Sequence, residues 1–119
     1  MDSFLSTPQV SRDSSPASVF VERIASWIDT LEKELNPNQQ LLVTALTLSG
    51  REIIVKWIGY QNPNLVAISG FSSGHQCTLL LHQESVQLLC VKQPVEQGEE
   101  RRRIGFQKAD GQAQESHLK

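Results

Sequence analysis

Five short apolar segments follow one another between Leu41 and Val91, and their spacing limits the folds that this chain can adopt. Polar or glycine-containing connections of only a few residues separate them. Connections this short join antiparallel neighbours, because parallel strands need a crossover of a dozen residues or more. The expected strands are 41–48, 51–60, 64–71, 77–82 and 85–91.

A helix is predicted immediately before these strands, over residues 15–36. Ser15 can cap its first turn, and Pro16 suits the first helical position. Pro37 disfavours helical geometry at Asn36 and ends the helix there. Apolar residues recur at helical spacing at Phe20, Ile24, Trp27, Leu31 and Leu35. We interpret this stripe as an ordinary core-facing surface rather than a groove for a partner.

The strand expected at 51–60 is apolar on both faces. One face carries Ile53, Val55 and Trp57, and the other carries Ile54 and Ile58. Such a strand lies between two layers or curls through a small barrel. Five short strands in an open sheet would also expose their edges. We therefore expect a mainly β chain with one N-terminal α-helix (α+β), folded as a strongly bent five-stranded antiparallel barrel that the helix caps.

Composition divides the chain into three parts. Residues 1–14 are rich in Ser and Asp and are predicted to be disordered, residues 15–93 form the domain, and residues 94–119 are predicted to be a flexible C-terminal tail. The formal net charge is −2, which disfavours sequence-blind binding to nucleic acid. No segment has the pattern of a signal peptide or the apolar length of a membrane span, so we expect a cytoplasmic protein without a membrane partner.

Catalytic and metal sites are not predicted. The potential zinc ligands are His75, Cys77, His82 and Cys90, which contain no second closely spaced ligand pair. Ser85, His82 and Glu84 are close in sequence, but a tight turn directs them outward and supplies no oxyanion donors. We therefore expect no enzyme, no cofactor and two reduced cysteines.

Two local patterns resemble the Sm-like family, which includes the bacterial Hfq proteins. The first runs from Leu46 to Val66: a strand, a turn at Gly50, a long strand, and an elbow that ends in Asn64 before another apolar strand. The second is LLLHQESVQLLCV at 79–91, where the family has an apolar strand, a tight turn and a closing apolar strand. Together with the preceding helix, the resemblance covers Phe20 to Val91.

The resemblance implies contacts with other molecules. Family members form rings by pairing the fourth strand of one subunit with the fifth of the next, which here implies a homo-oligomer through 77–82 and 85–91. They also commonly bind single-stranded RNA, by aromatic stacking and amide hydrogen bonds. The matching positions in this sequence are Tyr60, Asn64, His82 and Glu84.

Departures from the family pattern weigh against RNA binding. The elbow from Tyr60 to Asn64 is one residue short, and Val55 replaces a glycine of the long strand. His82-Gln83-Glu84 replaces Arg-Gly-Asn, and the carboxylate of Glu84 would repel a phosphate. We therefore interpret the elbow as a structural turn.

The C-terminal tail contains a candidate partner-docking motif, Arg101, Arg102, Arg103, Ile104 and Phe106. A flexible segment can place such apolar anchors in a groove of a partner, whereas the alternative is a solvated run of charge. We predict a noncatalytic adaptor or assembly chaperone that binds a protein through an Sm-like core and this tail. That design broadly resembles the small assembly factors of cyanobacterial carboxysomes. The alternative function is an Sm-like, Hfq-like protein that binds single-stranded RNA.

Overall fold

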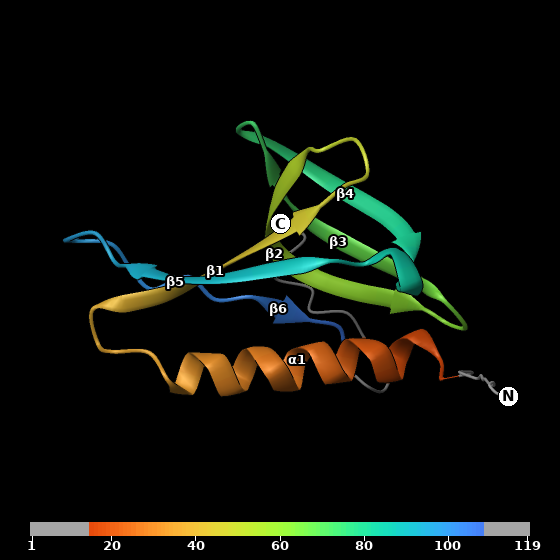
Figure 1. Cartoon of the computed structure of the whole chain (residues 1–119), viewed down its shortest axis with the longest axis horizontal. Helices are drawn as coiled ribbons and strands as arrows, with labels where there is room; N and C mark the ends of the chain where they lie inside the picture. Colours follow the sequence, from red (N-terminus) through yellow and green to blue (C-terminus); the bar gives the residue numbers. More distant parts are fainter. Residues whose placement is uncertain (1–14, 109–119) are drawn as a thin grey trace, which may run out of the picture.

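The computed structural model describes residues 15–108, in which one helix precedes a bent sheet (Figure 1). The elements are α1 Ala17–Lys33, β1 Gln39–Leu46, β2 Glu52–Gln61, β3 Leu65–Ser72, β4 His75–His82, the 3-10 turn η1 Gln83–Ser85, β5 Leu88–Pro94 and β6 Gly105–Phe106. The prediction of a mainly β chain with one N-terminal helix is confirmed. The predictions for residues 1–14 and 109–119 lie outside the described residues.

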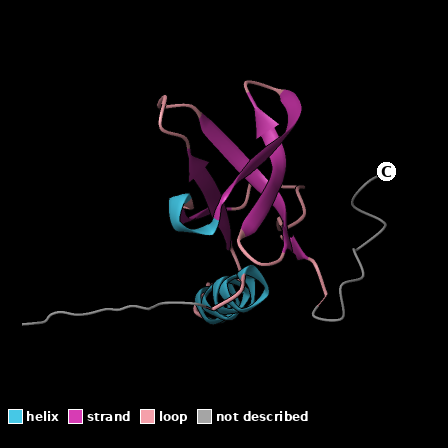
Figure 2. Ribbon diagram, turned by 90° about the vertical axis from the view of Figure 1, so that its right-hand side faces the viewer, coloured by secondary structure: helices cyan, strands magenta, loops and turns pink. Residues whose placement is uncertain are grey.

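The strands form one sheet in the order β4-β3-β2-β1-β5, with antiparallel pairing between these neighbours. β4 and β5 lie at the two ends of this path, and no pairing joins them within residues 15–108. The predicted closed barrel is therefore not confirmed, because the described sheet is open. Figure 2 shows the strongly bent strands with α1 lying end-on below them.

A β-bulge gives β2 two buried faces. The register with β3 shifts between Val55 and Trp57, so that Ile58 lies opposite Ile68. Because side chains alternate along a strand and the bulge adds one residue, Ile58 returns to the face of Val55, and Trp57 points to the opposite face. The predicted face of Ile53, Val55 and Trp57 is thus wrong for Trp57.

The bend also separates β1 from the second half of β2. Their ladder extends only from Leu46–Glu52 to Thr44–Ile54, whereas β1 pairs with β5 from Gln39 to Ala45, which is all of β1 except its last residue. The vacated edge of β2 is taken by β6, which runs parallel to it and places Gly105 opposite Trp57. An unpaired edge would leave backbone polar groups unsatisfied, and β6 supplies their partners.

The C-terminal segment up to residue 108 therefore belongs to the domain. Ile104 and Phe106 pack against the core cluster, and the N–H of Gln107 donates to the carbonyl of Ile58 at 3.0 Å. The expectation of a flexible tail from residue 94 does not hold for residues 101–108. Its low apolar content hid one short strand, whose partner lies more than 40 residues away in the sequence.

Local hydrogen bonding explains the shifted element ends. The loop expected at 72–76 is reduced to Ser73-Gly74, which both have positive φ (52° and 80°), so β4 already begins at His75. Two residues of this conformation form a tight hairpin turn. At the end of α1, the N–H groups of Glu34 and Leu35 donate to carbonyls three residues back, so the regular helix ends at Lys33 rather than at residue 36.

The core lies between α1 and the concave side of β1, β2 and β3. It contains Ala17, Val21, Ile28, Leu41, Val43, Ala45, Ile53, Val55, Ile58, Val66 and Ile68. The helix contributes Ala17, Val21 and Ile28 as its fully buried residues. The predicted stripe of larger side chains therefore lies toward the edge of the helix–sheet interface, on the side that faces β5.

Candidate functional site

An apolar groove lies between α1 and β5. The residues that line it are Phe20, Arg23, Ile24, Trp27, Ile28, Leu31, Leu88 and Cys90, and the enclosed volume is about 470 Å³. Seven of the eight are apolar side chains or a thiol, and Arg23 alone carries a charge. Concave apolar surfaces with few polar groups are typical of binding sites.

Trp27 is the most exposed large apolar side chain of the groove. It keeps 68% of its surface exposed, although the sequence pattern placed it on the core-facing stripe. The interpretation of this stripe as ordinary core is wrong for Trp27. Because Ala17, Val21 and Ile28 occupy the center of the helix interface, Trp27 is turned to its margin, and an exposed Trp beside other apolar groups is a common anchor for a partner.

The free edge of β5 borders the same groove. β5 pairs with β1 on one side, from Leu88 to Pro94, and has no strand on its other side within residues 15–108. Leu88 and Cys90 line the groove, whereas Leu89 and Val91 alternate with them and are 52% and 39% exposed. The edge therefore offers unpaired backbone groups next to apolar side chains, which is the arrangement that a strand from another chain can extend.

An ion pair connects α1 to β5 next to the groove. The Nζ atom of Lys92 lies 3.1 Å from Oε1 of Glu34, and both side chains are partly exposed. Pairs of this kind contribute little to stability, about 0–1 kcal/mol. The pair therefore marks where the C-terminal end of the helix lies beside β5 and is not the interaction that fixes it there.

Cys90 is a packing residue of this groove. Burial raises the pKa of its thiol, so the neutral form is favoured. A neutral thiol is a poor nucleophile and a poor metal ligand. Cys77 and Cys90 are both free cysteines.

The residue expected to stack on RNA, Tyr60, is used within the fold. Its hydroxyl donates to the carbonyl oxygen of Lys108 at 3.0 Å, and its backbone N–H donates to Oε1 of Gln107 at 2.9 Å. The ring is half-buried against the core cluster. The C-terminal segment therefore contacts both the hydroxyl and the backbone of Tyr60.

The other three RNA candidates lie on the turn that follows β4 or contact it. The carbonyl of Asn64 accepts from the N–H of Gln83 at 2.9 Å, which ties the elbow to this turn. The Nδ1 atom of His82 accepts from the N–H of Glu84 at 3.0 Å. Asn64, His82 and Glu84 are all exposed, and the structure brings them to one end of the sheet without a cavity that includes them among the described pockets.

The elbow itself caps the helix. The N–H of Ala17 donates to the carbonyl of Pro63 at 2.7 Å, and the N–H of Ser18 donates to Oδ1 of Asn62 at 2.9 Å. The first turn of α1 has no side-chain cap from Pro16, so these groups satisfy helix donors that would otherwise lack partners. This geometry agrees with the interpretation of the elbow as a structural turn.

The arginine-rich motif is folded against its own chain. The guanidinium of Arg101 donates to the carbonyls of Asn36 and Gln39 at 2.8 and 2.9 Å, which closes the loop between α1 and β1. The N–H of Arg102 donates to Oε1 of Gln40 at 3.0 Å. Arg103 is exposed, whereas Ile104 and Phe106 are half-buried in the core.

Residues 15–108 contain no group of three or more His, Cys, Asp or Glu side chains arranged to hold a metal ion. None of the helices in this range is long and apolar enough to cross a membrane.

Sequence reasoning did not predict the groove. The available signal was the width of the apolar stripe on α1, which has more large side chains than one helix interface with a small sheet can bury. Comparison with known proteins adds no guide to the site: no family model matches the chain, and neither the curated proteins nor the solved structures gave a significant match.

Proposed function

We propose that this chain is a noncatalytic adaptor that binds an extended apolar segment of a partner protein in the groove between α1 and β5. One observation carries the proposal: the apolar groove and the free edge of β5 belong to the same surface. A strand added to this edge would gain backbone hydrogen bonds. Every second side chain of it would point to the face on which Leu88 and Cys90 line the groove.

The expected contact is dominated by a few residues. Trp27 and Phe20 offer aromatic surface on the helix side, and Leu88 offers an aliphatic side chain on the strand side. Binding energy concentrates on such aromatic anchors when a partner excludes water from them. Arg23 is the charged residue at the rim, where it favours a partner segment that carries a negative charge.

The proposal includes a role in assembling a larger complex, as a chaperone-like adaptor that would use the same surface. The predicted tail contact now has less support, because Ile104 and Phe106 pack on the core and would have to leave it to reach a partner. The groove is therefore the primary contact in this proposal. A cytoplasmic location is supported by the two unpaired cysteines, since secreted proteins usually pair theirs.

The proposal includes a divergent Sm-like fold. Its support is the helix before five antiparallel strands and the position of β4 and β5 at the two free ends of the sheet. These are the strands that Sm-like proteins pair between subunits. Self-association through β4 would occupy the same edge of β5 as a partner strand, so the two modes of binding are mutually exclusive.

Two matched variants test the adaptor function. Trp27→Ser removes the exposed anchor of the groove, whereas Leu48→Ser removes a fully exposed apolar side chain on the β1–β2 turn, outside the groove. Proteins that co-purify with the full-length chain from its native source are quantified by mass spectrometry. We expect a specific partner to be lost at least about tenfold from Trp27→Ser and retained by Leu48→Ser, because a tenfold loss needs only about 1.4 kcal/mol.

The result that would contradict the proposal is an unchanged set of co-purifying proteins in both variants. Light scattering of the same samples distinguishes a partner protein from a second copy of the chain at the edge of β5. If the chain alone forms a multimer and Trp27→Ser dissociates it, the occupant of the groove is a second copy of the chain and not another protein.

A further inference from the structure

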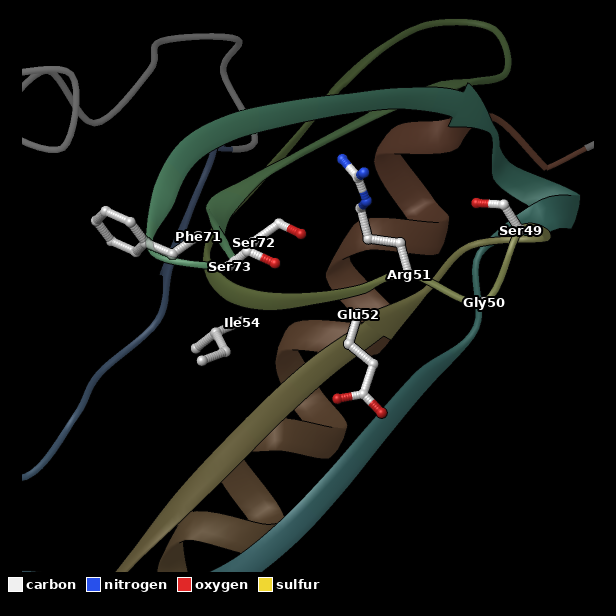
Figure 3. A pocket seen from close by; sticks show the side chains of 8 residues that line it. All are labelled: Ser49, Gly50, Arg51, Glu52, Ile54, Phe71, Ser72 and Ser73. Atoms are coloured by element: carbon white, nitrogen blue, oxygen red, sulfur yellow. The ribbon is translucent and has the colours of Figure 1, made fainter.

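A second cleft lies away from the groove, between the β1–β2 turn and the β3–β4 turn. Its volume is about 670 Å³. The polar side chains that line it are Ser49, Arg51, Glu52, Ser72 and Ser73, and the apolar ones are Ile54 and Phe71 (Figure 3). The cleft therefore has a cationic, hydroxyl-rich part and an apolar part.

Arg51 supplies the positive charge of the cleft from a fixed turn. Its backbone N–H donates to Oγ1 of Thr47 at 3.0 Å, and its carbonyl accepts from the N–H of Thr47 at 3.0 Å. The side chain is exposed and extends between the two turns in Figure 3. The turn thus holds the start of this side chain in place and leaves its guanidinium group open to solvent.

No carboxylate neutralises this guanidinium among the described residues. The side-chain ion pairs found there join Lys33 to Asp29 and Lys92 to Glu34. Glu52, the neighbour of Arg51, also lines the cleft, but Figure 3 shows its carboxylate directed away from the guanidinium group. The bidentate donor pattern of Arg51 is therefore available to an anion from solution.

Three hydroxyl groups surround the same space. The hydroxyls of Ser72 and Ser73 point to the side of the cleft on which Arg51 lies, and Ser72 is only 7% exposed. Ser49 approaches from the opposite turn, where its hydroxyl is 3.1 Å from that of Thr47. Hydroxyls can donate to an anion while they accept a second bond, so the cleft offers several donors to one group.

The apolar part of the cleft faces a different portion of a ligand. Phe71 keeps 39% of its surface exposed at the end of β3, and Ile54 lies beside it on β2. These residues cannot contribute to anion binding. They instead favour an apolar group that is attached to the anion and removed from water on binding.

We infer that this cleft binds a small organic phosphate, specifically a phosphate monoester with an attached apolar group. A phosphate monoester presents three acceptor oxygens, which suits a bidentate guanidinium together with the serine hydroxyls. A carboxylate has fewer oxygens for the same donors and is the weaker ligand here. This site is independent of the groove between α1 and β5.

Phenyl phosphate is the probe for the test, with the full-length chain and amide chemical shifts from NMR as the readout. We expect saturable shifts at Gly50, Arg51, Ser72 and Ser73, in the two turns that form the cleft. Arg51→Gln should weaken binding at least tenfold, and Arg51→Lys should lie between this variant and the wild type. Lys56→Gln removes the same charge from a residue outside the cleft lining and should bind like the wild type.

Three comparison ligands define the chemical class. Benzoate and inorganic phosphate should bind at least several-fold more weakly than phenyl phosphate, and benzyl alcohol should cause no shift in the two turns. The absence of shifts with phenyl phosphate, or equal binding by Arg51→Gln and the wild type, would overturn the site. Equal binding of inorganic and phenyl phosphate would overturn the assignment of an apolar group to the ligand. Dispersed spectra of Arg51→Gln verify that this exposed substitution leaves the fold intact.

Discussion

The two tryptophans stand beside two sheet edges that the molecule treats in opposite ways. Trp57 lies at the edge of β2, where β6 pairs with the strand, and it is only 8% exposed. Trp27 lies beside the free edge of β5 and is 68% exposed. The C-terminal segment covers Trp57 and the edge of β2. Trp27 and the free edge of β5 form an open pair that no strand of residues 15–108 covers. On this contrast rests our proposal that the open pair is the surface for another chain.

The packing around Trp57 gives the largest expected effect. A Cβ atom at position 59 would overlap the Trp57 ring and lie 2.8 Å from Oε1 of Gln107. We expect Gly59→Ala to lower the free energy of unfolding by about 3 kcal/mol, because overpacking displaces both the indole and the C-terminal segment. Chemical denaturation measures this. At position 105 the added Cβ lies 3.0 Å from the ring, so Gly105→Ala should cost less. Equal stability of Gly59→Ala and the wild type would contradict the packing of Trp57.

Removing the anchor of the C-terminal segment should convert the closed edge into an open one. Phe106 is half-buried against the core, so Phe106→Ala should cost about 2 kcal/mol, less than a fully buried Phe. The fluorescence of Trp57 should shift to longer wavelength as β6 is released. Arg103→Ala, at an exposed position in the same segment, should change stability by less than about 0.5 kcal/mol. If Phe106→Ala has the stability and the emission of the wild type, Phe106 does not anchor the C-terminal segment to the core.

The difference between the two indoles can be measured directly with single-tryptophan variants. Trp57→Phe leaves only Trp27, and Trp27→Phe leaves only Trp57. Acrylamide should quench the emission of Trp27 several-fold more strongly than that of Trp57, since quenching follows exposure. Similar quenching constants in the two variants would remove the contrast between the open and the covered edge.

A smaller effect is expected from the thiol in the groove. Burial raises the pKa of Cys90, so the folded chain retains the thiol proton at a pH where the unfolded chain has lost it. The stabilisation is present below the ordinary thiol pKa of about 8.5 and is lost as the pH rises toward the folded value. The free energy of unfolding should therefore fall slightly between about pH 8 and 10, and Cys90→Ala should reduce this fall. Cys77→Ala serves as the matched control, and the same pH profile in wild type and Cys90→Ala would contradict the effect.

The parts of this fold that follow short sequence periods could be predicted. The helix and the five main strands follow from apolar spacing. The loop between β3 and β4 is shorter than expected, because the positive φ angles of Ser73 and Gly74 form a two-residue turn. The faces of β2 could not be predicted, because a bulge at Lys56 reverses the alternation after Val55 without a distinct sequence signal. The sixth strand depends on pairing across more than 40 residues and has no periodic pattern of its own.

The candidate sites show the same limit. The Asn and Pro content of the elbow predicts a turn, and residues 62–64 form one, but its role as the cap of α1 depends on a contact between Asn62 and Ser18, 44 residues apart. The groove depends on how far α1 is rotated over the sheet. The small residues Ala17 and Val21 decide that rotation, because they allow the closest approach, and the sequence pattern gave more weight to the larger Trp27.

The most direct test of the central claim is a photo-crosslinking experiment in the native source. A benzophenone amino acid is placed at position 27, beside the free edge of β5, or at position 48, which is even more exposed but lies outside the groove. We expect position 27 to capture one heterologous protein through an extended apolar segment, identified by mass spectrometry, and position 48 not to capture it. Equal crosslinking from both positions, or none from position 27, would contradict a partner site between α1 and β5.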